Sequence, residues 1–308
     1  MSEQADCKRL GCFWGQCVGD ALGSLVEFKT KATISRIYPD GIKKLEASSV
    51  FPIAECGQLT DDSEMAIALL NSMHDENGDF IGYSPERAMR NYRDWFDSDP
   101  IDCGMTVASA ICGAPNPSSE SNGALMRASA LAINSRLTDE QTLAEWARVD
   151  AEITHPNRVC QQANQLFVLL IRFLLESSAE RDSGDELYAQ ALRIVKAYEL
   201  TTISALVVQA RQANMSDFYT NMGWVRIALH NALFHLFNET PWREAVHTTV
   251  IQGGDTDTTA AIVGALLGAR DGLSAIPEDW LQDVQNAIPV HRPHYLHARH
   301  GASLLAEV

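Results

Sequence analysis

The chain of 308 residues lacks the features that mark several common classes of protein. Basic side chains are scarce, since 24 Lys and Arg stand against 40 Asp and Glu and leave a net charge of −16. A nucleic-acid partner needs clustered Lys and Arg, so this charge argues against one and suits metals or a guanidinium. No run of about 18 uncharged apolar residues occurs, and we therefore expect no membrane span. The seven cysteines are odd in number and form no Cys-x-x-Cys pair, as expected of reduced thiols in a cytoplasmic compartment.

Common catalytic motifs are missing as well. The chain contains no G-x-S-x-G turn, no Walker A sequence, no H-E-x-x-H and no G-x-G-x-x-G after a strand. Each of these motifs would have pointed to one reaction class. Oxygen-bearing side chains remain as the candidates for chemistry.

Alternating strand-like runs are scarce too, and this absence bears on the fold. Ala, Leu, Met, Glu and Gln dominate segments with a helical period, such as 157–177 and 184–199. No composition break, Ser/Pro linker or fixed repeat divides the chain. We therefore expect an all-α fold in a single multi-helix domain over 1–308, with 1–9 and 290–308 as peripheral tails.

Glycine recurs every fourth residue in the helix expected over 10–25, at Gly11, Gly15, Gly19 and Gly23. This spacing places all four on one side of a helix. Because glycine is a poor helix former, four of them indicate the close approach of another helix or of a ligand. A packed helix is the simpler interpretation, and charged neighbours such as Asp20 argue against a membrane seam.

Two acidic clusters stand at the heads of apolar runs almost 200 residues apart. Buried acids are costly unless they are paired or bound to a cation. Taken alone, the first cluster, Thr60-Asp61-Asp62, is better explained as a helix N-cap with acids favoured by the helix dipole. Our hypothesis is that the clusters meet and hold metal through Thr60, Asp61, Asp62, Asp255, Asp257 and Thr258.

The chemistry of these six side chains suits hard cations. Carboxylate and hydroxyl oxygens are the ligands that Mg²⁺ and Mn²⁺ prefer. Four carboxylates carry four negative charges, which two divalent ions would balance, whereas one ion would leave surplus charge. The arithmetic favours a binuclear centre.

Two further motifs are weak by themselves. The stretch Ser121-Asn122-Gly123 offers amides before a helix, which suits an anion such as phosphate, although an ordinary cap and turn explain it too. His155 precedes Pro156 at a helix boundary, where it either contacts a ligand or serves the fold.

Taken together, these motifs resemble those of the ADP-ribosylglycohydrolase family, over about residues 10–270. They occur in the family's order: Gly15-Gln16-Cys17-Val18-Gly19-Asp20-Ala21-Leu22-Gly23, Thr60-Asp61-Asp62, Ser121-Asn122-Gly123-Ala124-Leu125-Met126-Arg127, Thr154-His155-Pro156 and Gly253-Gly254-Asp255-Thr256-Asp257-Thr258. The resemblance implies an all-α fold with a binuclear Mg²⁺ or Mn²⁺ centre. It also implies cleavage of the N-glycosidic bond between ADP-ribose and a modified protein side chain.

The resemblance also assigns roles to single residues. Glu27 is similar in position to the family's loop glutamate near the metals, and we expect it to act in catalysis with Asp61 and Asp257. Thr256, between the two acids, is expected to point away from the metals. The residues expected to contact substrate are Glu120, Asn122, Gly123, His155 and Trp224.

The linkage and partners follow from the same resemblance. The form Thr60-Asp61-Asp62-Ser63-Glu64-Met65 and the stretch 100–104 are closer to the arginine-directed branch than to the serine-directed one. Trp224 could stack on a guanidinium or pack in the core. We expect an ADP-ribosylated protein as substrate and ADP-ribose as product. The alternatives are another ADP-ribose linkage, on serine, a nucleic-acid base or an acyl ester, and an immunity-type protein that binds a cognate ADP-ribosyltransferase.

Overall fold

The structure is a computed structural model that describes residues 3–134, 138–179 and 182–306. The described residues contain helices and isolated β-bridges but no strand, which confirms the predicted all-α class. The helices are α1 (Glu3–Gly23), α2 (Lys31–Ile37), α3 (Asp61–Ser72), α4 (Pro85–Phe96), α5 (Met105–Ile111), α6 (Ser129–Ile133), α7 (Glu140–Thr154), α8 (Arg158–Glu176), α9 (Gly184–Ala197), α10 (Ser204–Gln212), α11 (Val225–Phe237), α12 (Trp242–Val250), α13 (Thr256–Asp271), α14 (Glu278–Asn286) and α15 (Ala298–Ala306). Short 3₁₀ turns over Leu273–Ala275 and His294–Leu296 join the last of them.

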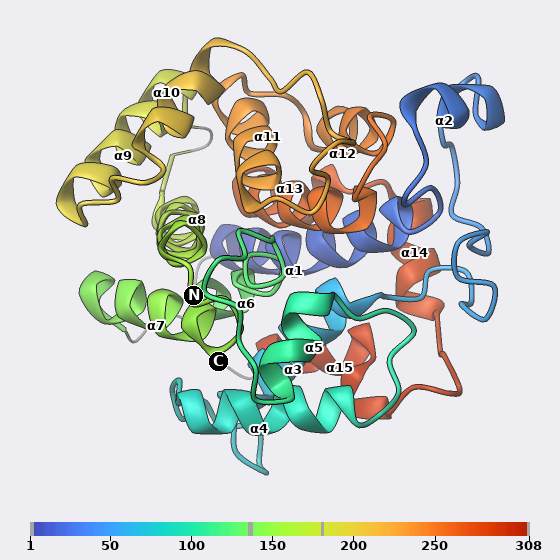
Figure 1. Ribbon diagram of the computed structural model, residues 1–308, viewed down its shortest axis with the longest axis horizontal. Coiled ribbons are helices and arrows are strands. Elements are labelled where there is room, and N and C mark those ends of the chain that lie inside the picture. Colours follow the sequence, from blue (N-terminus) through green and yellow to red (C-terminus); the bar gives the residue numbers. More distant parts are fainter. Residues whose placement is uncertain (1–2, 135–137, 180–181, 307–308) are drawn as a thin grey trace.

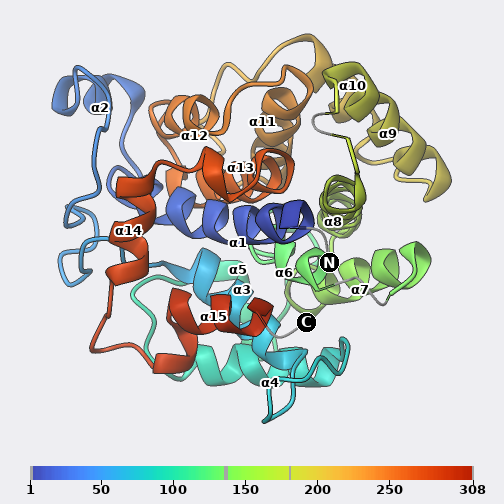
Figure 2. The same cartoon turned by 180° about the vertical axis from the view of Figure 1, so that it is seen from behind.

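Helix α1 crosses the middle of the molecule with α13 beside it (Figure 1). Helices α11 and α12 lie on one side of this pair, and α3, α4 and α5 lie on the other. Seen from behind, α15 covers α3 (Figure 2). None of the helices that the structure describes combines the length and apolar character needed to cross a membrane.

Local sequence signals explain where many helices begin. Helix α4 starts at Pro85 behind the N-cap Ser84, whose hydroxyl accepts a hydrogen bond from Arg87 N. Helix α9 begins with a capping box between Ser183 and Glu186. Such starts depend on neighbouring residues alone, so they are readable from sequence.

The glycine face of α1 packs against α13, which confirms the prediction of close helix packing. A Cβ atom added at Gly15 would lie 2.3 Å from Gly264 O, and one at Gly19 would lie 2.3 Å from Ala260 O. Reciprocally, a Cβ at Gly264 would lie 2.1 Å from Gly15 O. The two backbones therefore touch along the seam, and no larger side chain fits between them.

The tails that we expected to be peripheral contain buried, hydrogen-bonded arginines. Arg9 is 2% exposed and donates to Ile133 O at 3.1 Å from within α1. Arg292 is 4% exposed and forms two hydrogen bonds with the buried Glu64, at 2.8 and 2.7 Å. The buried Glu64 carboxylate on α3 is stabilised by this pairing with Arg292. The segment around residue 292 therefore packs against α3 and is not a peripheral tail. The outermost residues of the tails, 1–2 and 307–308, lie outside the described residues.

The seam predicts an unusual response to a glycine-to-alanine change. In an unhindered helix Gly→Ala stabilises by about 0.5–1 kcal/mol. We expect Gly15→Ala instead to lower the free energy of unfolding by about 1–3 kcal/mol, because the new methyl group overlaps the backbone of α13. Chemical denaturation measures the change. Gly104→Ala is the matched control, since a Cβ there meets no described atom within 4 Å; a Gly15→Ala protein as stable as the wild type would contradict the packing argument.

Candidate metal centre

The end of α1 and the start of α13 are joined by a backbone contact that positions three acids. Gly253 and Gly254 have φ of 80° and 83°, and a Cβ at Gly253 would lie 2.3 Å from Lys29 O. Gly254 N donates to Lys29 O at 3.0 Å, and Phe28 N donates to Gly254 O at 2.8 Å. This pairing holds Glu27, just before Phe28, against the first turn of α13.

Helix α3 contributes the second acidic cluster, and a residue of α1 caps it. Thr60 occupies the N-cap position but makes no side-chain cap bond. Instead, the Asp20 carboxylate accepts hydrogen bonds from Thr60 N at 3.2 Å and from Ser63 N at 3.1 Å. Because Asp20 satisfies these amides, Asp61 and Asp62 are not needed as caps. Thr60 thus occupies the N-cap position with acids in the first turn, as the local interpretation has it, but the bond that caps Ser63 N comes from Asp20 and not from Thr60.

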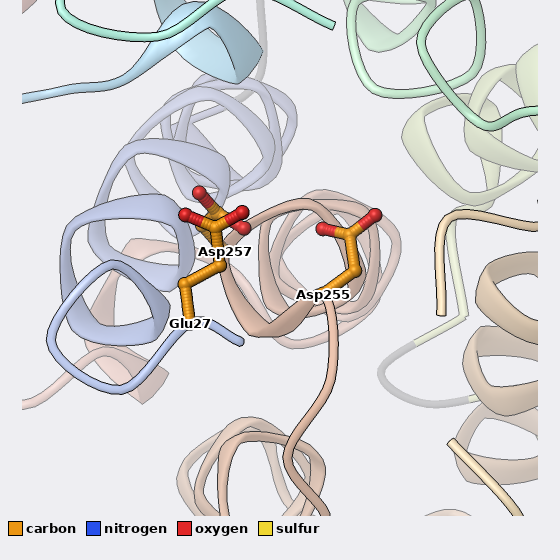
Figure 3. Close-up of side chains that lie close together, drawn as sticks. All are labelled: Glu27, Asp255 and Asp257. Carbon is orange, nitrogen blue, oxygen red and sulfur yellow. The ribbon is translucent and has the colours of Figure 1, made fainter. Parts of the chain in front are cut away.

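Three carboxylates from the two sides of the seam lie together. Glu27, Asp255 and Asp257 offer oxygens that are all within 4.8 Å of one another (Figure 3). Thr256, between the two aspartates, instead donates to Gly23 O at 2.7 Å, as expected of a residue that points away from the acids. Asp255 and Asp257 therefore both lie close to Glu27, whereas the hydroxyl of Thr256 between them points toward α1.

The acids of α3 belong to the same electrostatic cluster. Burial, followed by the charge of Glu27 and then that of Asp62, raises the pKa of Asp257 well above its usual range. Burial, followed by the charge of Asp61, does the same for Asp62. Burial and then the charges of Asp255 and Asp102 raise the pKa of Glu27 to about 9. Without a cation, these carboxyl groups would favour protonation.

The cluster also contains acceptors that nothing satisfies. Glu27 Oε2 and Asp62 Oδ1 are buried and accept no hydrogen bond from any described residue. A buried carboxylate oxygen without a partner is costly, whereas cation coordination would satisfy it. The donor set of carboxylates and Thr hydroxyls fits a hard divalent cation on these grounds.

A cavity of about 370 Å³ opens over the acids. Its walls include Glu27, Asp61, Asp255 and Thr258 from the acidic clusters. The cavity also reaches residues that the substrate prediction named, namely Asn122, Gly123 and His155. Acids and substrate candidates far apart in sequence therefore border one space, although Thr60, Asp62 and Asp257 lie beneath its surface.

The turn at residues 121–123 is held from behind by a buried ion pair. Arg127 and Asp150 are both fully buried and lie 3.0 Å apart, and Arg127 Nη1 donates to Gly123 O at 3.1 Å. The His155 ring lies against Gly123, where an added Cβ would be 3.1 Å from the ring. His155 Nε2 and Ser121 Oγ are hydrogen-bonded at 2.8 Å. His155 thus supports the turn as well as bordering the cavity.

Two predicted substrate residues lie at the edge of this arrangement. Glu120 forms an ion pair with Arg226 at 2.7 Å and is absent from the cavity wall. Trp224 is 45% exposed, so it is not the core residue that the alternative interpretation required. An isolated bridge to Ser121 places Trp224 beside the turn.

Two acids that contact the candidate site, Asp102 and Asp20, were not among the site residues predicted from the sequence. Asp102 lines the cavity, and burial raises its pKa. It lies within the stretch 100–104 that we used only to distinguish branches of the family. Asp20 caps α3 from α1, and only its position on the glycine helix hinted at a role.

The buried His155 predicts a contribution to stability that depends on pH. Burial and the charge of Arg127 lower its pKa from 6.5 to about 3. Between these values the unfolded chain binds a proton that the folded ring does not, so the stabilisation is complete above pH 6.5 and is lost as pH falls toward 3. We expect His155→Gln to reduce the slope of unfolding free energy against pH by up to about 1.4 kcal/mol per unit between pH 6 and 4. Denaturation at a series of pH values measures the slope, and an NMR titration showing a His155 midpoint near pH 6.5 would contradict it.

Known proteins with related sequences match nearly the whole length of this chain. The sequence model of the family described as ADP-ribosylglycohydrolase matches residues 1–306. ADP-ribosyl-(dinitrogen reductase) glycohydrolase of Rhodospirillum rubrum is 29% identical over an alignment of 285 residues, and the match covers 89% of each chain. ADP-ribosylarginine hydrolase Tri1 of Serratia proteamaculans is 24% identical over 91% of this chain and 75% of its own. A solved structure titled ADP-ribosylglycohydrolase-related protein complex superposes with a TM-score of 0.76 at 26% identity, covering 99% of this chain and 98% of that one. The chain therefore belongs to the ADP-ribosylglycohydrolase family.

Proposed function

We propose that this protein is a metal-dependent hydrolase that removes ADP-ribose from modified arginine side chains of proteins. Family membership supports an enzyme that hydrolyses ADP-ribose linkages. The observation that carries the metal dependence is the buried acidic cluster, in which Asp62 Oδ1 has no hydrogen-bond partner among the described residues.

The ligands would come from both sides of the helix seam. Asp255, Asp257 and Thr258 would be contributed by α13, and Thr60, Asp61 and Asp62 by the start of α3. The four aspartates carry enough charge for two divalent cations, Mg²⁺ or Mn²⁺. When bound, such ions hold ribose hydroxyls and lower the pKa of water.

The chain's own residues would position the reactants and move one proton. In the reaction, water supplies a hydroxyl group to C1″ of the ribose and a proton to the departing guanidine nitrogen, as the C–N bond between them breaks. Glu27 would accept a proton from the attacking water, a role supported by its Oε2, which has no hydrogen-bond partner among the described residues. Asn122 and Gly123 border the space for the ribose and pyrophosphate.

The arginine linkage is supported by the chemistry of the cavity wall. A guanidinium is cationic, and Asp102 borders the cavity with a carboxyl group beyond the four that two divalent cations would balance. Trp224 stands half-exposed beside the 121–123 turn, where a guanidinium could stack on its ring. A neutral O-glycosidic bond to serine would gain nothing from either feature.

The linkage is tested with two matched substrates. We expect release of ADP-ribose from an arginine-modified protein at least about 10-fold faster than from a serine-modified one, because cation–π and charge contacts together supply the difference of about 1.4 kcal/mol. Free ADP-ribose is measured by chromatography. Release from the serine substrate alone would contradict the arginine assignment but leave a hydrolase of another ADP-ribose linkage.

The metal dependence is tested at the acid that both clusters surround. We expect Asp257→Ala to lower kcat at least about 100-fold, the order for loss of a catalytic metal ligand, and a chelator to abolish release by the wild type. Asp94→Ala, at an exposed acid of α4, is the control and should retain turnover. Full activity of the wild type in chelator would refute the metal mechanism.

A further inference from the structure

We infer that Asn122 is a positioning residue that orients the Asp255 carboxylate toward the cation, rather than a side chain reserved for substrate. The inference rests on the proposed metal-dependent function. It assigns a second layer of contacts to the centre, and it gives a physical reason for an asparagine at this position of the turn.

A short hydrogen bond carries the inference. Asn122 Nδ2 donates to Asp255 Oδ2 at 2.7 Å, and Asn122 is only 6% exposed. No other described residue donates a hydrogen bond to that carboxylate. Asp255 occupies the N-cap position of α13 but makes no side-chain cap bond, so the helix itself does not orient it. With Oδ2 held by the amide, Oδ1 remains for a cation.

The amide of Asn122 is itself fixed through its backbone. Asn122 N donates to Gly223 O at 3.0 Å, and Asn122 O accepts from Leu125 N at 2.8 Å and from Met126 N at 3.1 Å. The next carbonyl, of Gly123, accepts from the buried Arg127. The donor therefore sits on a rigid support, which is what an orienting group requires.

The chemistry of an amide suits this place better than that of a charged side chain. An amide N–H donates without adding charge, so it leaves the Asp255 carboxylate anionic for a cation. A lysine or arginine would neutralise the carboxylate and compete with the metal, and an ionised aspartate could not donate and would repel it. Partners of this kind orient ligands, and their loss typically costs about 10- to 100-fold in metal affinity.

The test measures metal binding by the metal-free full-length protein and does not need turnover. Mn²⁺ is titrated into each variant, and free Mn²⁺ is followed by electron paramagnetic resonance. We expect Asn122→Ala to weaken Mn²⁺ binding by about 10- to 100-fold. Asn231→Ala is the matched control, because Asn231 is also buried and donates a 2.8 Å side-chain hydrogen bond, but to Thr249 Oγ1; its Mn²⁺ affinity should equal that of the wild type.

A double-mutant cycle separates positioning from a general structural effect. In the Asp255→Ala background, we expect Asn122→Ala to cause no further loss of Mn²⁺ affinity, because the group it orients is gone. An equal loss in both backgrounds would overturn the inference. Should Asn122→Ala fail to fold, Asn122→Leu decides, since it removes the donor, keeps a side chain of similar size and adds no charge.

The outcomes distinguish the inference from the function beneath it. Tight Mn²⁺ binding by the wild type and equally tight binding by Asn122→Ala would overturn the role of Asn122 and leave the metal-dependent hydrolase standing. Failure of the wild type to bind Mn²⁺ would overturn both. A loss of Mn²⁺ affinity on Asn122→Ala that does not recur in the Asp255→Ala background, with Asn231→Ala unchanged, supports both.

Discussion

The direct backbone contact between α1 and α13 is the constraint on which the rest of the structure depends. Glycines on both helices let the two axes approach until carbonyls and Cα atoms touch, as the 2.1–2.3 Å positions of hypothetical Cβ atoms at Gly15, Gly19 and Gly264 demonstrate. The close approach brings the end of α1 beside the start of α13. Glu27 and the pair Asp255 and Asp257 therefore share one small space, and a wider seam would separate them.

Concentrating acids in this way is electrostatically unfavourable, and the fold compensates with groups from other elements. Asp20 caps α3 from α1, which releases the acids of α3 from that task. Asn122 reaches Asp255 from a distant turn, itself supported by the ion pair of Arg127 and Asp150. Burial still raises the pKa values of Asp62 and Asp257. A divalent cation would stabilise the ionised forms of such buried acids. Stability and chemistry thus depend on the same desolvated site.

The sequence predicted the parts of the molecule that depend on near neighbours or on strong motifs. The all-α class follows from helical periodicity, and the packed face of α1 follows from glycine at every fourth residue. The role of Thr60-Asp61-Asp62 was ambiguous, because a helix start with a Thr and two acids looks the same whether it caps itself or serves a site. The structure resolved this ambiguity through Asp20, which accepts a hydrogen bond from Thr60 N. The two residues are 40 positions apart, so the contact has no local signature in the sequence. The pairing of Glu120 with Arg226 has no local signature either, since it joins segments 106 residues apart.

By itself, then, the sequence determined the helices, the glycine seam, the acidic composition of two helix starts and the family whose motifs they share. Those properties reside in spacing and residue type along the chain. The tertiary structure alone decided which oxygen of each acid is satisfied, that Asp102 borders the cavity, and that the Asn122 amide faces Asp255. Such outcomes depend on distances between atoms of different helices, and these distances are set only when the seam closes and the cluster is removed from water.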